Sequence, residues 1–145
     1  MREILFRGKR RDNGEWVYGF YCYNSLMKRA EIFSFDETRS YAYEVIPETV
    51  GRFTNSTDKN GKKIFEDDIL NNEWCFACGN SVVKFGTYKT LDMTGKYQQG
   101  HLGFHLEHTH EADKRSMRMD LMFFANKGEI VGNIHDNPEF LEVTK

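Results

Sequence analysis

The residues with the clearest chemical potential are two cysteines separated by two residues. The sequence Cys75-Phe76-Ala77-Cys78-Gly79 has the spacing of the knuckle that supplies half of the ligands in a zinc ribbon. The chain has 3 cysteines in all, the third being Cys22, so histidines would have to complete a zinc site. Alternate residues of a strand share a face, so histidines two or four positions apart could bind together. The candidates are His101, His105, His108 and His110.

These histidines have two further interpretations, as surface residues of a polar loop or as the solvent-facing side of a strand. A dithiol pair near histidines also occurs without a metal in a reducing compartment. A thioredoxin-like reaction would need a cysteine at a helix N-terminus within a βαβ unit, and the sequence predicts no such unit. Zinc therefore stays an alternative, and we expect no metal site and no cofactor.

A calcium site is the second chemical possibility, in the polar segment around Asn60-Gly61. If Gly61 is the glycine of a calcium loop, Asp58 and Asn60 fall at ligand positions, but Ser56 replaces the first acidic ligand. A hairpin turn explains the same residues, and the flanking residues are typical of strands. The sequence also has neither a nucleophile elbow nor a phosphate-binding glycine loop, so we expect no catalytic site and no enzymatic activity.

Basic residues cluster in the N-terminal part of the chain, at Arg7, Lys9, Arg10 and Arg11. Such a run is most often a solvated face, but with Trp16 and Tyr18 nearby it also fits phosphate contacts combined with base stacking. The whole chain has 20 Lys and Arg against 22 Asp and Glu, a net charge of -2. Net charge therefore does not favour a nucleic-acid partner, which stays an alternative.

Strands and tight turns must position these residues, because apolar and aromatic residues recur in short extended runs. The first hairpin is predicted over residues 3–23, with its turn at Asp12-Asn13-Gly14. Residues 63–70 are predicted to form two extended pieces with a bend between them, and Asn137-Pro138 to start a helical turn. Further strands are predicted at residues 31–35, 41–46, 50–54, 82–88, 102–106, 129–134 and, as a buried strand, 121–124.

The predicted fold class is all-β, or mainly β, with a single domain over residues 1–145. A chain of 145 residues is long enough for one sizeable core. Its 12 Phe, 7 Tyr and 2 Trp supply much of the apolar area. Short bent strands fit a barrel-like or SH3-like-barrel arrangement that ends in a short C-terminal helical turn. The SH3-like part rests on an analogy with residues 69–85.

Neither a membrane segment nor a secretory signal is expected. No apolar run approaches the ~20 residues that a spanning helix needs. The short apolar start of the chain is interrupted by basic residues between Arg7 and Arg11. The odd number of cysteines also suits a reducing compartment. We therefore expect a cytoplasmic protein.

Three blocks of sequence carry a resemblance to a known family. They are residues 4–9 with 14–19, residues 50–54 with 58–69, and residues 131–139. In order and spacing they resemble the signature blocks of the YopX family, which implies a mainly β product of a phage or prophage gene in a bacterial host. The resemblance transfers no catalytic residue. The sequence departs from the family pattern at Asp67, where glycine is usual, although Asp also adopts the left-handed conformation at modest cost.

The leading hypothesis for function is a non-enzymatic binding module or adaptor that acts through a protein partner. The alternatives are a nucleic-acid-associated accessory protein and a zinc-stabilised binding domain. Edge strands would also permit homo-oligomers. The segment between Asn71 and Ala125 is the least family-like, and its Met-rich stretch from Lys114 to Phe124 is interpreted as core rather than as a binding surface.

Overall fold

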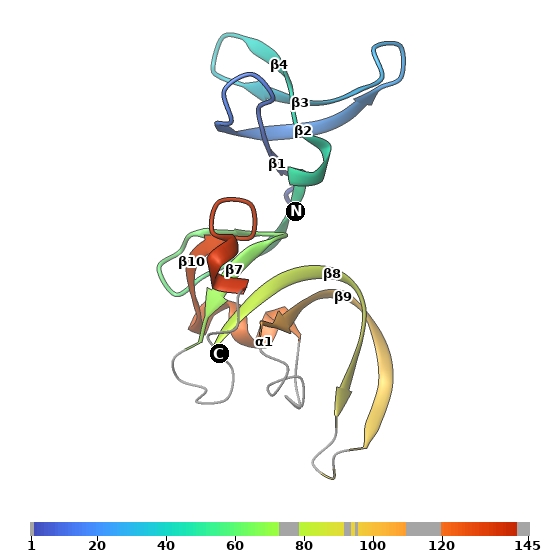
Figure 1. Cartoon of the computed structure of the whole chain (residues 1–145), viewed down its shortest axis with the longest axis vertical. Helices are drawn as coiled ribbons and strands as arrows, with labels where there is room; N and C mark the ends of the chain where they lie inside the picture. The colour runs from blue at the N-terminus through green and yellow to red at the C-terminus, as the bar shows by residue number, and fades with distance from the viewer. Residues whose placement is uncertain (1, 73–78, 92–93, 95, 110–119, 142–145) are drawn as a thin grey trace. The chain divides into compact units, whose positions relative to one another are not determined.

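The computed structural model describes residues 2–72, 79–91, 94, 96–109 and 120–141. β-strands dominate this part of the chain and form two antiparallel sheets (Figure 1). The predicted mainly β class is therefore confirmed. Within the described residues, neither sheet closes into a barrel.

The strands are short except for one long hairpin, and the helical elements are single turns. The strands are β1 (Phe6–Lys9), β2 (Trp16–Asn24), β3 (Arg29–Phe35), β4 (Ser40–Glu44), β5 (Gly51–Thr57), β6 (Lys63–Phe65), β7 (Asp68–Asn71), β8 (Asn80–Leu91), β9 (Tyr97–His108) and β10 (Glu129–Asn133). The helical turns are α1 (Leu121–Phe124) and the 3₁₀ turns Pro47–Thr49, Ala125–Lys127 and Pro138–Leu141. Among the described residues, no helix is both long enough and apolar enough to cross a membrane.

The chain divides into two compact units, an N-terminal unit, Met1–Asn55, and a C-terminal unit, Ser56–Lys145. The division falls inside β5, which runs from the first unit into the second. Each unit contains its own cluster of buried apolar side chains. The interpretation of residues 1–145 as one domain stays a prediction.

The N-terminal unit is built on the predicted hairpin of β1 and β2, in which Phe6 lies opposite Gly19 and Lys9 opposite Trp16. Within this unit, β3 and β4 continue the sheet beyond β2, and the first residues of β5 pair with β1 on the other side. Gly19 is required by a close approach of β3, because a Cβ there would lie 1.9 Å from the carbonyl oxygen of Phe33. The buried core of the unit consists of Ala30, Ile32 and Val45, with Phe6, Val17 and Val50 packed against it.

A further contact joins the residues that follow β1 to those that follow β4. Arg10, which follows β1, forms a bridge with Val45, which follows β4. The backbone N–H of Arg11 donates to the carbonyl oxygen of Glu44 at 3.0 Å, and that of Ile46 donates to Lys9 at 2.9 Å. The rest of β4 stays the outer strand of the sheet.

The C-terminal unit contains the second sheet, in the order β10-β7-β8-β9. β8 and β9 form a hairpin of 12 residues in each strand, and they curve together (Figure 1). β7 pairs with the beginning of β8, where Ile69 lies opposite Val82. The buried cluster consists of Ile64, Leu70, Val83, Leu106, Leu121, Phe124 and Ala125.

Residues 121–124 form one turn of α-helix, so the predicted buried strand is wrong here. Leu121 and Phe124 are both buried, whereas the side chain of Met122 is 87% exposed. Residues three apart share a helix face, but in a strand they would point to opposite faces. A short apolar run does not distinguish the two structures. Packing of both side chains into one core therefore favoured the helical turn.

The turn between β5 and β6 is organised by the buried carboxylate of Asp58. Its Oδ1 accepts hydrogen bonds from the backbone N–H groups of Asn60 and Lys62, both at 2.9 Å, and its Oδ2 accepts one from Ile130 at 3.1 Å. Burial raises the pKa of Asp58, but these backbone donors and the Lys62 charge outweigh it, so the pKa is lowered. The Asp58 side chain thus satisfies two backbone N–H groups of the turn and links the turn to β10.

We expect the Asp58→Asn substitution to lower the free energy of unfolding at pH 7 by about 1–3 kcal/mol, because an amide NH₂ would face backbone donors. The folded-state pKa of Asp58 is lowered, so its stabilisation is present above the unfolded-state value of about 3.9 and is lost as the pH falls through the folded-state value. The difference between the two proteins should therefore shrink in acid. Urea denaturation at neutral and acidic pH measures it.

The matched control is Asp36→Asn. Asp36 also accepts backbone hydrogen bonds in a hairpin turn, from Thr38 and Arg39, but it is exposed. We expect a smaller loss of stability for this variant than for Asp58→Asn. Equal losses would contradict the role assigned to the burial of Asp58.

Candidate functional site

The basic turn after β1 is largely neutralised by acidic neighbours. Arg10 Nε donates to Asp12 Oδ1 at 2.9 Å, and the Arg10 guanidinium lies 4.5 Å from the centre of the Tyr43 ring. The hydrogen bond between Arg10 and Asp12 raises the pKa of Arg10 and lowers that of Asp12. Arg11 Nε lies 2.7 Å from Glu44 Oε1. The predicted phosphate-contacting run is thus engaged within its own unit.

Two further basic residues of this run lie over an aromatic ring. The Arg7 guanidinium is 4.7 Å from the centre of the Trp16 ring, and Lys9 Nζ is 5.8 Å from it. Arg7 is buried, with 6% of its surface exposed. Cation–π contacts of this kind stabilise β1 against β2, so here the basic and aromatic residues interact with each other.

Only some residues of the predicted zinc site belong to the described part of the chain. Cys75, Cys78 and His110 lie outside the described residues. Among the residues that are described, no group of three or more His, Cys, Asp and Glu side chains is arranged to hold a metal ion. Cys22 is exposed and forms no disulfide. Zinc therefore stays a prediction.

The three described candidate histidines all lie on β9, on two different faces. His101 and His105 stack on Tyr88 of β8, with ring centres 5.2 Å and 4.9 Å from that of the tyrosine. His105 Nε2 also lies 3.2 Å from Glu107 Oε1. His108 is on the opposite face of the strand, where its Nδ1 is 2.9 Å from Ser81 Oγ. The strand therefore separates His108 from the other two.

The predicted calcium ligands belong to the Asp58 turn. The Asp58 N–H donates to the carbonyl oxygen of Lys62 at 2.9 Å, and Gly61, with φ of 80°, takes the left-handed conformation. Both carboxylate oxygens of Asp58 already accept backbone hydrogen bonds. These residues form a hairpin turn in which the Asp58 carboxylate accepts hydrogen bonds from backbone N–H groups.

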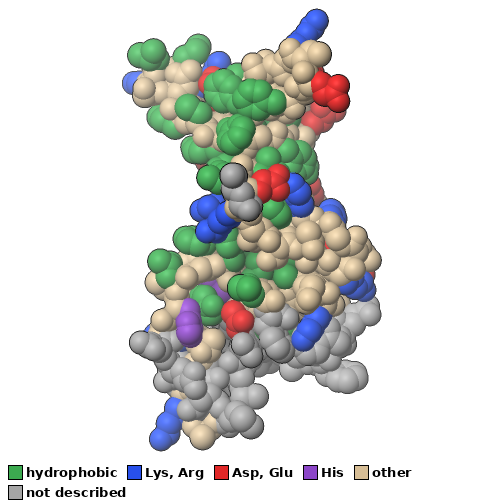
Figure 2. Space-filling model, turned by 180° about the vertical axis from the view of Figure 1, so that it is seen from behind, with side chains coloured by type: hydrophobic (Ala, Val, Ile, Leu, Met, Phe, Trp, Pro, Cys, Tyr) green, Lys and Arg blue, Asp and Glu red, His purple; other side chains and the backbone are tan. Residues whose placement is uncertain are grey.

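Exposed aromatic side chains of the N-terminal unit lie on both faces of β2, and three of them share one face of β2 and β3. Phe20 and Phe35 are 54% and 60% exposed, and their ring centres lie 5.7 Å apart in an edge-to-face arrangement. Tyr18, two residues before Phe20 on the same face of β2, is 46% exposed. We call Tyr18, Phe20 and Phe35 the aromatic face. Figure 2 shows hydrophobic side chains gathered at the surface over this part of the chain.

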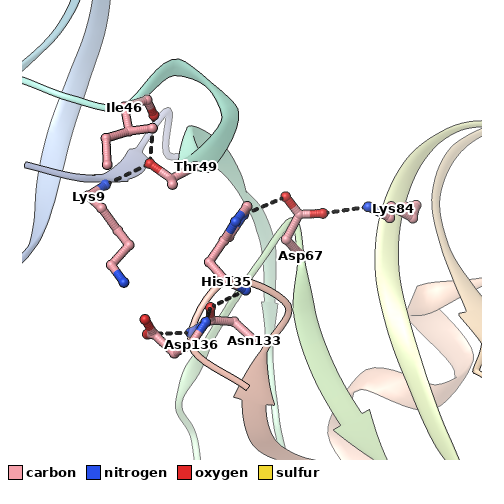
Figure 3. A network of polar contacts seen from close by, with 8 residues as sticks. All are labelled: Lys9, Ile46, Thr49, Asp67, Lys84, Asn133, His135 and Asp136. Atoms are coloured by element: carbon pink, nitrogen blue, oxygen red, sulfur yellow. Dashed lines mark hydrogen bonds and ion pairs between the residues drawn. The ribbon is translucent and has the colours of Figure 1, made fainter. Parts of the chain in front are cut away.

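A polar cluster in the C-terminal unit was not anticipated from the sequence. Asp67, between β6 and β7, lies between Lys84 of β8 and His135, which follows β10 (Figure 3). Its Oδ1 accepts a hydrogen bond from Lys84 Nζ at 2.7 Å, and its Oδ2 is 3.1 Å from His135 Nε2. The side chains of Asp67 and His135 are 16% and 17% exposed.

Backbone hydrogen bonds also hold the Asp67 cluster together. The Asp67 N–H donates to the carbonyl oxygen of Val83 at 2.8 Å, and the Ile134 N–H donates to that of Asp67 at 3.0 Å. Asp67 has φ of 67°, as expected for a residue in place of glycine. An Asp–His pair can orient a catalytic imidazole, but here the same carboxylate is shared with a lysine. The Asp67 side chain therefore links three segments: the turn between β6 and β7, the strand β8, and the residues that follow β10.

The sequence offered one signal for this cluster, the predicted bend at Asp67. The spacing of 68 residues between Asp67 and His135 matches no local pattern, so only the pairing of β7 with β8 and β10 reveals their contact. The Met-rich stretch predicted to be core falls largely on residues 110–119, outside the described part of the chain. Of its described members, Leu121 and Phe124 are buried and Met122 is exposed.

We expect Asp67→Ala and Asp67→Gly to differ in stability although both lose the carboxylate. Each loses the bonds to Lys84 and His135, but alanine at positive φ also carries a backbone cost of about 1–2 kcal/mol that glycine avoids. The glycine variant should therefore unfold at the higher urea concentration. Identical unfolding curves for the two variants would show that the left-handed backbone costs nothing here.

In its described part, this chain is a mainly β protein of two antiparallel sheets. It belongs to the YopX protein family, whose sequence pattern matches residues 5–142. The family resemblance inferred from the three sequence blocks is confirmed. No protein with a curated description matches the chain.

Proposed function

We propose that this protein is a phage- or prophage-encoded binding module that works in the bacterial cytoplasm through a protein partner and catalyses no reaction. The observation that carries this proposal is the aromatic face of β2 and β3. Exposed, clustered aromatic residues are costly to leave in water, and they are enriched at protein interfaces. The edge-to-face pair of Phe20 and Phe35 offers a rigid apolar contact area.

The charge distribution around the sheet supports a protein partner over nucleic acid. The net charge is -2, and Arg10 and Arg11 are paired with Asp12 and Glu44. A surface for phosphates would present unpaired positive charge. An apolar, aromatic surface instead matches the hot spots of protein interfaces, which are rich in buried rings.

The test begins with capture of partners by the tagged full-length chain from bacterial cells that carry its phage element. Each captured protein is then purified and its binding measured against the wild type and the double variant Phe20→Ser/Phe35→Ser. We expect the double variant to bind at least about tenfold more weakly, since truncation of a hot-spot residue at an interface costs about 2 kcal/mol or more.

Leu26→Ser is the matched control for this experiment. Leu26 is 95% exposed and lies in the turn between β2 and β3, away from the aromatic face. Its binding should equal that of the wild type, and all variants should keep the wild-type melting temperature. Undiminished binding by the double variant would remove the aromatic face from the proposal.

The alternative of a nucleic-acid-associated accessory protein has one supporting feature, the position of Arg7 and Lys9 over Trp16. We expect the purified protein to pass through immobilised DNA and RNA at low salt without retention, because its charges are balanced. Retention that falls as salt is raised, and that is lost in a Lys9→Gln variant, would instead favour nucleic acid. Retention by Lys9→Gln equal to that of the wild type would exclude the Trp16 surface.

A further inference from the structure

The turn between β2 and β3 exposes two aliphatic side chains at its tip. β2 ends at Asn24, and β3 begins at Arg29, which lies opposite it. Between them, Leu26 is almost fully exposed and Met27 is 59% exposed. Turns usually carry Gly, Asn, Asp, Ser or Pro, which suit both the backbone conformation and contact with water. The presence of Leu26 and Met27 at this tip therefore needs another explanation.

Other residues fix the conformation of this turn. The Oδ1 of Asn24 accepts a hydrogen bond from the backbone N–H of Met27 at 3.0 Å. Lys28 has φ of 50°, in the left-handed region that glycine occupies at lower cost. The turn would therefore form with polar side chains in place of Leu26 and Met27, and more easily with glycine in place of Lys28.

The hairpin of β2 and β3 continues past the strands that flank it. β1 pairs with β2 as far as Gly19, and β4 pairs with β3 from Phe35 to Glu31. β2 and β3 go on to the pair of Asn24 and Arg29, and the turn lies at the outer end of the hairpin (Figure 1). The flanking strands therefore leave the tip uncovered.

Tyrosine and basic side chains lie next to the tip. Tyr23 and Tyr21 are 57% and 40% exposed, and they share one face of β2 because they are two residues apart. Lys28 is exposed, and Arg29 forms an ion pair with the buried Glu31. No acidic residue occurs between Tyr21 and Glu31. The end of the hairpin is therefore apolar with a net positive charge, although the whole chain has a net charge of -2.

We propose that the tip of this hairpin inserts shallowly into a lipid surface that contains anionic lipids. Leu26 and Met27 enter the boundary between the head groups and the acyl chains, and Lys28 extends back to the phosphates. A strand rises about 3.3 Å per residue, so Tyr23 lies about 10 Å from the tip. That depth is close to the membrane–water interface, where tyrosine is enriched.

The shape and charge of the tip favour a lipid surface over a second protein. A specific protein interface buries about 800 Å² on each partner, which is more than a convex turn with two aliphatic side chains offers. Lipids rearrange around a small convex group, so no matching pocket is needed. The positive charge is complementary to anionic head groups. The internal bond of the Met27 N–H also lowers the cost of moving the turn out of water.

Binding through this tip alone is weak and reversible. Even one myristoyl chain gives only marginal membrane binding, and two aliphatic side chains bury less apolar surface. The tip therefore adds to the protein partner of the proposed function and does not replace it. The inference is independent of the aromatic face, because Tyr18 and Phe20 lie on the face of β2 opposite Tyr21 and Tyr23.

The test is co-sedimentation of the purified full-length protein with lipid vesicles. Vesicles of equal parts phosphatidylcholine and phosphatidylglycerol supply the anionic surface, and vesicles of phosphatidylcholine alone supply the neutral one. A reducing agent is present because Cys22 is exposed. We expect the wild type to bind the anionic vesicles, less so as salt is raised, and to bind the neutral vesicles about fivefold more weakly.

Two variants separate the apolar contribution from the charged one. Leu26→Ser/Met27→Ser should lower partitioning into anionic vesicles by about tenfold or more, because both inserted side chains are lost. Lys28→Gln should lower it about fivefold and weaken its dependence on salt. The matched control is Phe20→Ser/Phe35→Ser, which changes the aromatic face and should partition like the wild type. All variants should keep the wild-type circular dichroism spectrum.

A tryptophan at the tip reports insertion itself. The 2 Trp of the wild type set the baseline for fluorescence. In a Leu26→Trp variant, anionic vesicles should shift the added emission to shorter wavelengths, and quenchers attached to the acyl chains should reduce it. In a Ser40→Trp variant, with the substitution at the exposed start of β4, neither change should occur.

Three results would overturn the proposal. They are equal binding, or no binding, of the wild type to the anionic and neutral vesicles, partitioning that Leu26→Ser/Met27→Ser leaves unchanged, and Leu26→Trp emission that vesicles do not alter. Loss of binding to a captured protein in Leu26→Ser, without vesicle binding by the wild type, would assign the tip to a protein pocket instead. Partitioning that falls in the tip variants but not in Phe20→Ser/Phe35→Ser would support the lipid surface, whatever the aromatic face binds.

Discussion

The carboxylate of Asp58 is the interaction on which the C-terminal unit most depends. A protein built of short strands must reverse direction often, and each reversal leaves backbone N–H groups without a ladder partner. Where such groups are shielded from water, a side chain must satisfy them. Asp58 accepts two of these groups within its own turn and a third from Ile130, so a single side chain satisfies the turn and attaches it to β10.

Side chains of Asp and Asn also accept backbone hydrogen bonds at other turns, which differ in how far they are buried. The carboxylate of Asp36 accepts from Thr38 and Arg39 in the exposed turn before β4. The side-chain carbonyl oxygen of Asn133 accepts from the N–H groups of His135 and Asp136 after β10. Short Asp and Asn side chains suit this task because they reach the backbone two or three residues ahead. The turns at Asp58 and Asn133 lie within the sequence blocks that resemble the family pattern.

In the N-terminal unit, basic side chains interact with groups of the same unit, whereas some aromatic side chains are exposed. Basic residues near the start of the chain interact with Asp12, Glu44, Trp16 and Tyr43, while Phe20 and Phe35 stay exposed. A small sheet cannot bury aromatic rings on both faces, because one face must meet water unless something covers it. The exposed rings and the outer strand β4 are thus consequences of the same shortage of covering elements, and both are open to other molecules.

The sequence by itself determined the β class, most strand positions, the hairpin of β1 and β2, the left-handed bend at Asp67 and the family. All of these follow from local signals, since alternation, turn residues and short blocks are read within about ten residues. The helical turn at Leu121 and the contacts of Asp67 with Lys84 and His135 were decided by tertiary structure. The same holds for the ion pairs of Arg10 and Arg11. These features depend on which strands become neighbours, and strand pairing joins residues far apart in the chain through backbone bonds that carry no sequence signature.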